Sequence, residues 1–72
     1  MLIEQLKKDA VMFVGQYNSR PDKDTPIGED NFMTQHFKRA LRNEDSDTVR
    51  VANEILLVAM YSVSEGIPYN LL

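Results

Sequence analysis

Apolar residues recur at steps of three and four in the first part of the chain, over residues 2–18. The positions that share one helical face are Leu2, Ile3, Leu6, Ala10, Phe13, Val14 and Tyr17. This spacing is typical of an amphipathic α-helix that buries one face. Val11 and Met12 lie beside that face and widen it. The segment therefore predicts a helix with more apolar surface than one neighbouring helix needs.

A turn-rich break follows over residues 19–29, where Pro21, Pro26 and Gly28 prevent the helix from continuing. Helix–helix connections are usually about 2–8 residues long, so this one is long for a small domain. Long loops often carry binding residues. A plain crossover between two helices explains the same residues, and the sequence leaves both interpretations open.

A second helical pattern spans residues 30–43. Asp30 or Asn31 is suited to cap its N-terminus. Its apolar face consists of Met33, Phe37, Ala40 and Leu41. The connection to the next apolar segment is short, so we expect the second and third helices to form an antiparallel hairpin.

The third helical pattern spans residues 47–65, after a capping residue at Asp45 or Ser46. Its most regular face follows a heptad-like seam of Val49, Ala52, Leu56, Ala59 and Val63. Eight of the nine residues from Ile55 to Val63 are apolar. A helix that is apolar nearly all round is usually buried nearly all round, so we expect it to be the central element.

Gly66 and Pro68 end this helix, because glycine suits a left-handed C-terminal cap and proline forbids continuation. The tail at residues 66–72 is rich in large apolar side chains. We expect it to fold back on the helices or to dock onto a neighbouring molecule.

These patterns predict an all-α fold with a single domain: a first helix, a long loop, and an antiparallel helical hairpin. The chain has 72 residues and no cysteine, which excludes disulfides and cysteine-based zinc sites. The core of so small a domain rarely supplies more than about 3–5 kcal/mol. Because small domains often gain stability by association, we expect a homo-oligomer.

Charge and hydropathy limit the partners. No uncharged apolar run reaches the roughly 18 residues of a membrane span, and the N-terminal residues lack the pattern of a signal peptide, so we expect a cytoplasmic protein without a membrane partner. The net charge is −3. Lys38, Arg39 and Arg42 form a small basic cluster that acidic residues follow at once. Duplex nucleic acid is therefore not an expected partner.

The sequence contains no recognisable catalytic constellation. His36 is the only histidine, and no spacing joins it to a nucleophile and a carboxylate. Asp22 and Asp24 begin like a calcium loop, but Ile27 stands where that loop needs glycine and Met33 where it needs glutamate. We expect no enzyme activity, no cofactor and no metal.

One group of residues is a candidate ligand site. Tyr17, Arg20, Lys23 and Thr25 lie at the end of the first helix and in the long loop. An aromatic face, cations and a hydroxyl suit a nucleotide, through stacking and phosphate pairing. Such a site would lie at a subunit junction of a nucleotide-binding or sequestering oligomer. The alternative is that Tyr17 closes the edge of the core and the charged residues are solvated.

The apolar excess favours protein interaction over the ligand site. The candidate interface residues are Val51, Leu57, Val58, Met60, Tyr61, Tyr69, Leu71 and Leu72. Apolar side chains beyond those a core can bury usually mark interfaces. We therefore expect a small helical interaction module that self-associates and occupies a surface of a larger protein. Its size and acidic composition are typical of bacterial or phage regulators and inhibitors.

Overall fold

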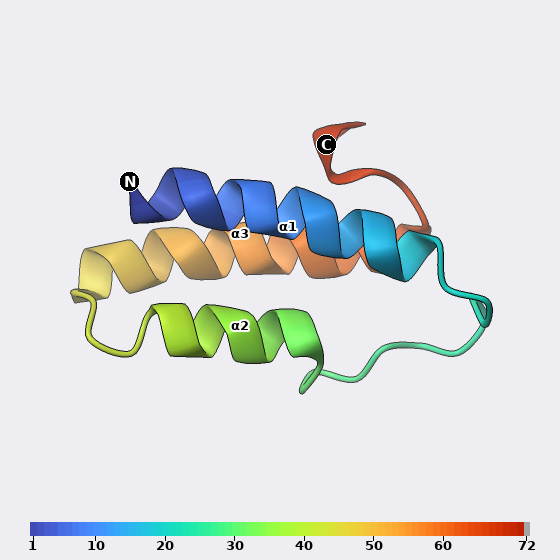
Figure 1. The fold of residues 1–72 in the computed structure, drawn as a ribbon, viewed down its shortest axis with the longest axis horizontal. Helices are drawn as coiled ribbons and strands as arrows, with labels where there is room; N and C mark the ends of the chain where they lie inside the picture. Colours follow the sequence, from blue (N-terminus) through green and yellow to red (C-terminus); the bar gives the residue numbers. More distant parts are fainter. Residues whose placement is uncertain (72) are drawn as a thin grey trace.

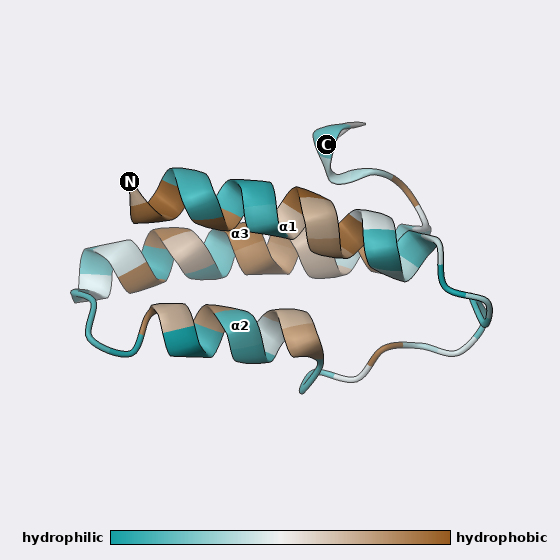
Figure 2. Ribbon diagram, in the orientation of Figure 1, coloured by the Kyte–Doolittle hydropathy of each residue, from teal (hydrophilic) through white to brown (hydrophobic). Residues whose placement is uncertain are grey.

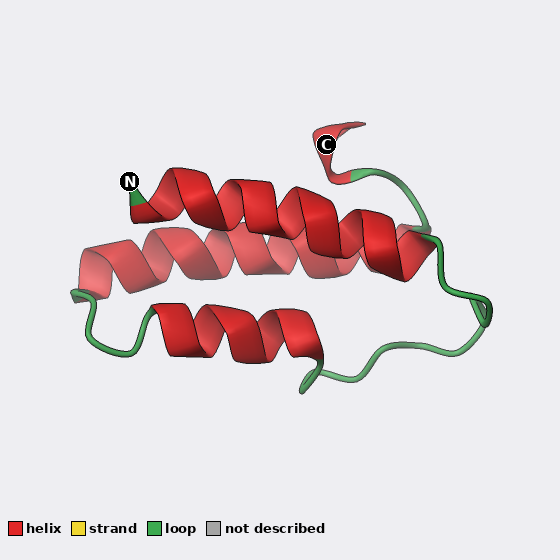
Figure 3. Ribbon diagram, viewed as in Figure 1, coloured by secondary structure: helices red, strands yellow, loops and turns green. Residues whose placement is uncertain are grey.

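The computed structural model describes residues 1–71 and contains three α-helices. They are α1 (Leu2–Asn18), α2 (Phe32–Ala40) and α3 (Ser46–Glu65), followed by a short 3-10 helix, η1 (Tyr69–Leu71) (Figure 1). The described part of the chain has no strand (Figure 3). The predicted all-helical fold with three helices is therefore confirmed.

Side-chain caps set the N-terminal ends of α2 and α3. Asn31 caps α2, because its Oδ1 accepts the backbone N–H of Thr34 at 2.9 Å. Asp45 caps α3 in the same way, through Thr48 at 2.7 Å. The helix expected over residues 30–43 therefore begins at Phe32, and it ends at Ala40 because turns occupy the following residues. The third helix begins one residue earlier than expected.

Gly66 ends α3 in the left-handed conformation, with φ of 68°. The backbone N–H of Gly66 donates to Val63 O at 3.2 Å, and that of Ile67 donates to Ser62 O at 3.0 Å. These two bonds form a Schellman motif, which satisfies the last helix carbonyls and turns the chain away from the helix axis. The cap directs the tail back toward α1.

The core lies between all three helices. Its ten buried hydrophobic residues are Leu6, Ala10, Val14, Met33, Phe37, Leu41, Ala52, Ile55, Ala59 and Val63. α1 and α3 run in the same direction and pack along most of their length, whereas the shorter α2 runs in the opposite direction and touches both (Figure 1). The turns of α1 and α3 that face each other are mostly apolar, and the loops are mostly polar (Figure 2).

The tail folds back on its own bundle. η1 packs against α1 and α3, and Tyr69 packs against the core. The side-chain amide of Asn18 donates to the backbone oxygen of Ile67 at 3.0 Å, which ties the tail to the end of α1. The side chain of Leu71 and the whole of Leu72, both predicted as interface residues, lie outside the described part. No helix within residues 1–71 has both the length and the apolar character needed to cross a membrane.

Candidate functional site

The surface is hollowed by a groove between α1 and α2, called here the α1–α2 groove. It has a volume of about 640 Å³ and is lined by Phe13, Gln16, Tyr17, Arg20, Phe32, Gln35, His36 and Arg39. Small-molecule sites in proteins usually occupy about 300–1,000 Å³. The groove is therefore large enough for a small organic ligand.

Each helix contributes the same pattern of side chains to this groove. Residues 13–20 read FVGQYNSR and residues 32–39 read FMTQHFKR, so Phe, Gln, an aromatic ring and Arg recur at identical spacing. Steps of three, four and seven place all four side chains on one face of α2, and the first three on one face of α1, whereas Arg20 follows two residues after α1 ends. The repeated pattern thus puts matching residues on the facing sides of α1 and α2.

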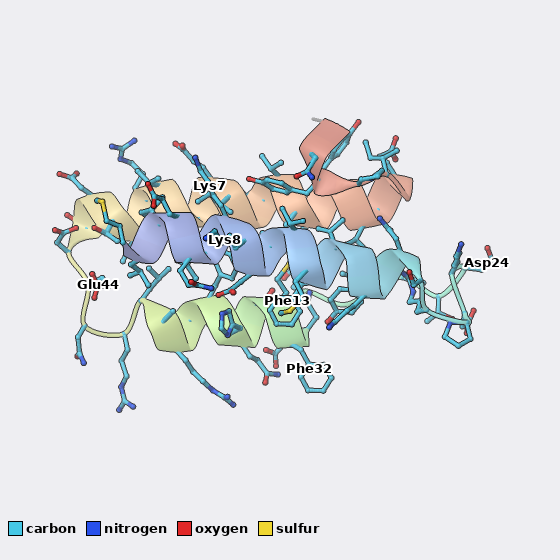
Figure 4. The ribbon with its side chains drawn as sticks, turned by 45° about the horizontal axis from the view of Figure 1, so that its top comes forward. Lys7, Lys8, Phe13, Asp24, Phe32 and Glu44 are labelled. Carbon is cyan, nitrogen blue, oxygen red and sulfur yellow. The ribbon has the colours of Figure 1, made fainter. Side chains whose placement is uncertain are left out.

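Because α1 and α2 run in opposite directions, each phenylalanine lies beside the other helix's tyrosine or histidine. The rings of Phe13 and His36 are 5.4 Å apart between centroids and tilted by 52°. At the other side of the groove, the backbone N–H of Phe32 donates to the hydroxyl of Tyr17 at 3.2 Å. In Figure 4 the ring of Phe13 lies between α1 and α2, and the ring of Phe32 projects from the start of α2 (Figure 4).

His36 is held in position by Asp9. Its Nε2 lies 2.7 Å from Asp9 Oδ2. A carboxylate only accepts hydrogen bonds, so Nε2 of His36 donates to Asp9 in either protonation state of the ring. Burial raises the pKa of Asp9, but hydrogen bonds from His36 and Gln5 and the charge of His36 lower it by more. The net pKa of Asp9 lies below its ordinary value, which keeps the carboxylate ionised.

Arg20 organises the long loop. Its Nη1 donates to Tyr17 O at 2.7 Å and its Nε donates to Asp22 O at 3.1 Å. Its Nη2 donates to Lys23 O at 3.0 Å and to Thr25 O at 2.9 Å. Four backbone carbonyls therefore surround one guanidinium. Since the group has five N–H donors, the loop occupies most of its capacity to bind a ligand.

The structure does not bring the four predicted ligand residues into one site. Tyr17 and Arg20 line the α1–α2 groove. Lys23 instead lines a second hollow of about 480 Å³, together with Arg20, Met60 and Tyr61 on the α3 side. Thr25 donates its hydroxyl to Asp22 Oδ2, which stabilises the loop itself.

The predicted interface residues divide into two groups. Leu57 and Tyr61 are 69% and 55% exposed, and Val58 is exposed beside them. Their spacing places them on one side of α3, away from the core, and this surface is called here the α3 outer face. Val51, Met60 and Tyr69 are instead partly buried and packed against the core.

Sequence reasoning did not place Phe32, Arg39 or the two groove glutamines together as the lining of one groove. Phe32 is 75% exposed, although it is a large apolar residue. The signal that could have found them is the repeated pattern of Phe, Gln, aromatic and Arg in residues 13–20 and 32–39.

The comparisons with known proteins give no further guide to the site. No family model matches the chain, and neither the curated proteins nor the solved structures gave a match. The function must therefore be argued from the residues and their arrangement.

Proposed function

We propose that this chain is a small protein-interaction module that self-associates through the α3 outer face and occupies a surface of a larger partner. The observation that carries the proposal is the exposure of Leu57 and Tyr61, at 69% and 55%, near the middle of the longest helix. Large apolar side chains are rarely left exposed together on a small domain, and tyrosine is enriched at protein interfaces.

Polar side chains border this apolar patch. Arg50 lies two turns and Glu54 one turn before Leu57 on the same side of α3, with their charged groups 3.8 Å apart. An apolar centre with a charged rim is the usual composition of an interface. Burying one such apolar side chain contributes about 1.5–3 kcal/mol, which is large beside the stability that so small a core supplies.

The test is the mass of the protein in solution, measured by size-exclusion chromatography with light scattering. We expect an oligomer for the wild-type chain and a monomer for Tyr61→Lys, because the lysine would place a charge in the interface. Met12→Lys is the matched control, since Met12 is 49% exposed but lies on α1. Circular dichroism checks that both variants fold.

A wild-type chain that is still monomeric at about 100 μM, far above the Kd of most specific dimers, would refute self-association. A Tyr61→Lys chain that keeps the wild-type mass would instead show that the interface lies elsewhere. The larger partner is tested separately, by comparing proteins captured from the native host by wild-type, Tyr61→Lys and Met12→Lys baits. A partner retained equally by all three would contradict binding through the α3 outer face.

A second candidate function is nucleotide binding or sequestration by an oligomer with sites at subunit junctions. The observation that favours it is the position of Tyr17 and Arg20 on one groove. Thermal-shift measurements with a panel of nucleotides test this function, because a ligand at about 100 times its Kd adds about 2.7 kcal/mol. A melting temperature that no nucleotide raises would contradict it.

A further inference from the structure

The charge of the α1–α2 groove is opposite to that of the rest of the chain. The lining residues include two arginines and no acidic residue. The whole chain has a net charge of −3, so the residues outside the groove together carry −5. A positive groove on a negative protein attracts an anion to that position.

Half of the residues that line the groove are aromatic. Phe13, Tyr17, Phe32 and His36 contribute four rings, and the amides of Gln16 and Gln35 are the uncharged polar groups of the lining. Flat aromatic faces bind planar rings by stacking, and amides add hydrogen bonds at the ring edge. The lining therefore suits a planar ring more than an aliphatic chain.

The two arginines are not equivalent, and this difference orients the ligand. The guanidinium of Arg20 is surrounded by four backbone carbonyls of the loop. The guanidinium of Arg39 is exposed and forms no hydrogen bond or ion pair with any part of the chain that the structure describes. Its planar fork is free to bind a carboxylate or phosphate through two parallel hydrogen bonds.

We propose that the α1–α2 groove of a single chain binds a small planar aromatic anion. The ring lies against Phe13, Tyr17, Phe32 and His36, and the attached phosphate or carboxylate pairs with Arg39. The groove volume of about 640 Å³ accommodates a ring with one such group. The site needs no second subunit, so this proposal is independent of self-association through α3.

The test is a titration followed by two-dimensional amide NMR, with four probes. Adenosine 5′-monophosphate carries a ring and a phosphate, and benzoate carries a ring and a carboxylate. Adenosine supplies the ring alone, and inorganic phosphate supplies the anion alone. We expect at least one ring-bearing anion to shift the signals of Gln16, Gln35, His36 and Arg39 with a Kd about tenfold below that of adenosine or phosphate.

The two ring-bearing probes also identify the anionic group. Tighter binding of adenosine 5′-monophosphate than of benzoate indicates a phosphate ligand, and the reverse order indicates an aromatic carboxylate. Either order supports the proposal, provided that the shifted signals lie in the α1–α2 groove.

Two variants locate the contacts. Arg39→Gln should raise the Kd of the bound probe about tenfold by removing a charged hydrogen bond, whereas Arg42→Gln, on the turn just after α2, should leave it unchanged. Phe32→Ala should also weaken binding, whereas Leu57→Ala on the α3 outer face should not. Phe32, Arg39, Arg42 and Leu57 are exposed, so we expect all four variants to fold, and their circular dichroism spectra check this.

Three results would overturn the proposal. The first is the absence of a saturable shift in the groove with any probe at about 10 mM, a concentration above the Kd of most specific ligands. The second is an equal loss of binding in Arg39→Gln and Arg42→Gln. The third is a set of shifts centred on Lys23 and Thr25 instead of the groove. None of these results bears on the oligomer, because the mass measurements on Tyr61→Lys test that separately.

Discussion

The guanidinium of Arg20 offers the sharpest test of how the long loop is held. Four backbone carbonyls accept its N–H groups at 2.7–3.1 Å, one at the end of α1 and three within the loop. A lysine at this position keeps the charge, but its single ammonium group cannot span the same carbonyls as a planar fork. Arg20→Lys therefore separates the effect of charge from that of geometry.

The expected loss follows from the number and exposure of these bonds. A hydrogen bond contributes about 0.5–1.5 kcal/mol, and the lower value applies here because water replaces the lost bonds of an exposed loop. Arg20→Ala should then destabilise the fold by about 2 kcal/mol, and Arg20→Lys by somewhat less. With a slope near 1 kcal/mol per molar urea, the alanine variant should unfold at about 2 M less urea.

Urea denaturation followed by far-UV circular dichroism measures the free energy of unfolding. The rate of trypsin cleavage reports how often the loop opens. Lys23 is the one trypsin site in the loop that proline does not protect, since Pro21 follows Arg20. Both variants should be cut after Lys23 faster than the wild type. Arg50→Lys is the control, because the exposed pair of Arg50 with Glu54 contributes little.

Unchanged stability and unchanged cleavage in Arg20→Lys would refute the reasoning, since charge alone would then suffice to hold the loop. Unchanged values in Arg20→Ala would show that the loop carbonyls are equally well satisfied by water.

Two further predictions concern polar contacts of α1 and α2. Asn31→Ala removes the N-cap of α2 and a hydrogen bond to Gly28 O at 2.7 Å. Urea denaturation should therefore show that the free energy of unfolding falls by about 1 kcal/mol. A similar fall in the control Asn43→Ala would contradict a specific cap. The pKa of Asp9 is lower in the folded chain than its ordinary value of 3.8, so its carboxylate stabilises the fold above that pH and loses this effect as pH falls through the lower native pKa. The stability difference between wild type and Asp9→Asn should therefore shrink between about pH 5 and about pH 2.5, and a constant difference would show that the charge of Asp9 is not responsible.

The helices and the core follow from local sequence patterns. α1 spans the expected residues, and all ten buried hydrophobic residues come from the apolar positions recognised in the three helical segments. Periodicity of this kind can be read from sequence because a residue's place on a helix depends only on its near neighbours. The ends of α2 were harder to predict, since Asn31 rather than Asp30 is the cap and turns replace the last three expected helical residues.

The candidate sites depended on which faces the helices turn toward one another. Val51, Met60 and Tyr69 were expected at an interface, yet they are partly buried and pack against the core of their own chain. Lys23 and Thr25 were expected beside Tyr17, yet the loop carries them away from the α1–α2 groove. The chemical type of these residues indicated whether each could form apolar or charged contacts, but it did not indicate which residues would lie next to them.

The sequence by itself determined the three helices, their apolar faces and the glycine cap at Gly66, because these depend on contacts within a few residues. Only the tertiary structure decided that α2 runs against α1, that Phe13 meets His36, and that Arg20 binds its own loop while Arg39 stays free. The contacts of Arg20 span only two to five residues, but they depend on the fold of an irregular loop that no periodic pattern describes. The direction of α2 and the meeting of Phe13 with His36 depend on packing between segments about twenty residues apart or more in the chain, where side-chain shape and helix direction select among arrangements that the sequence pattern allows equally.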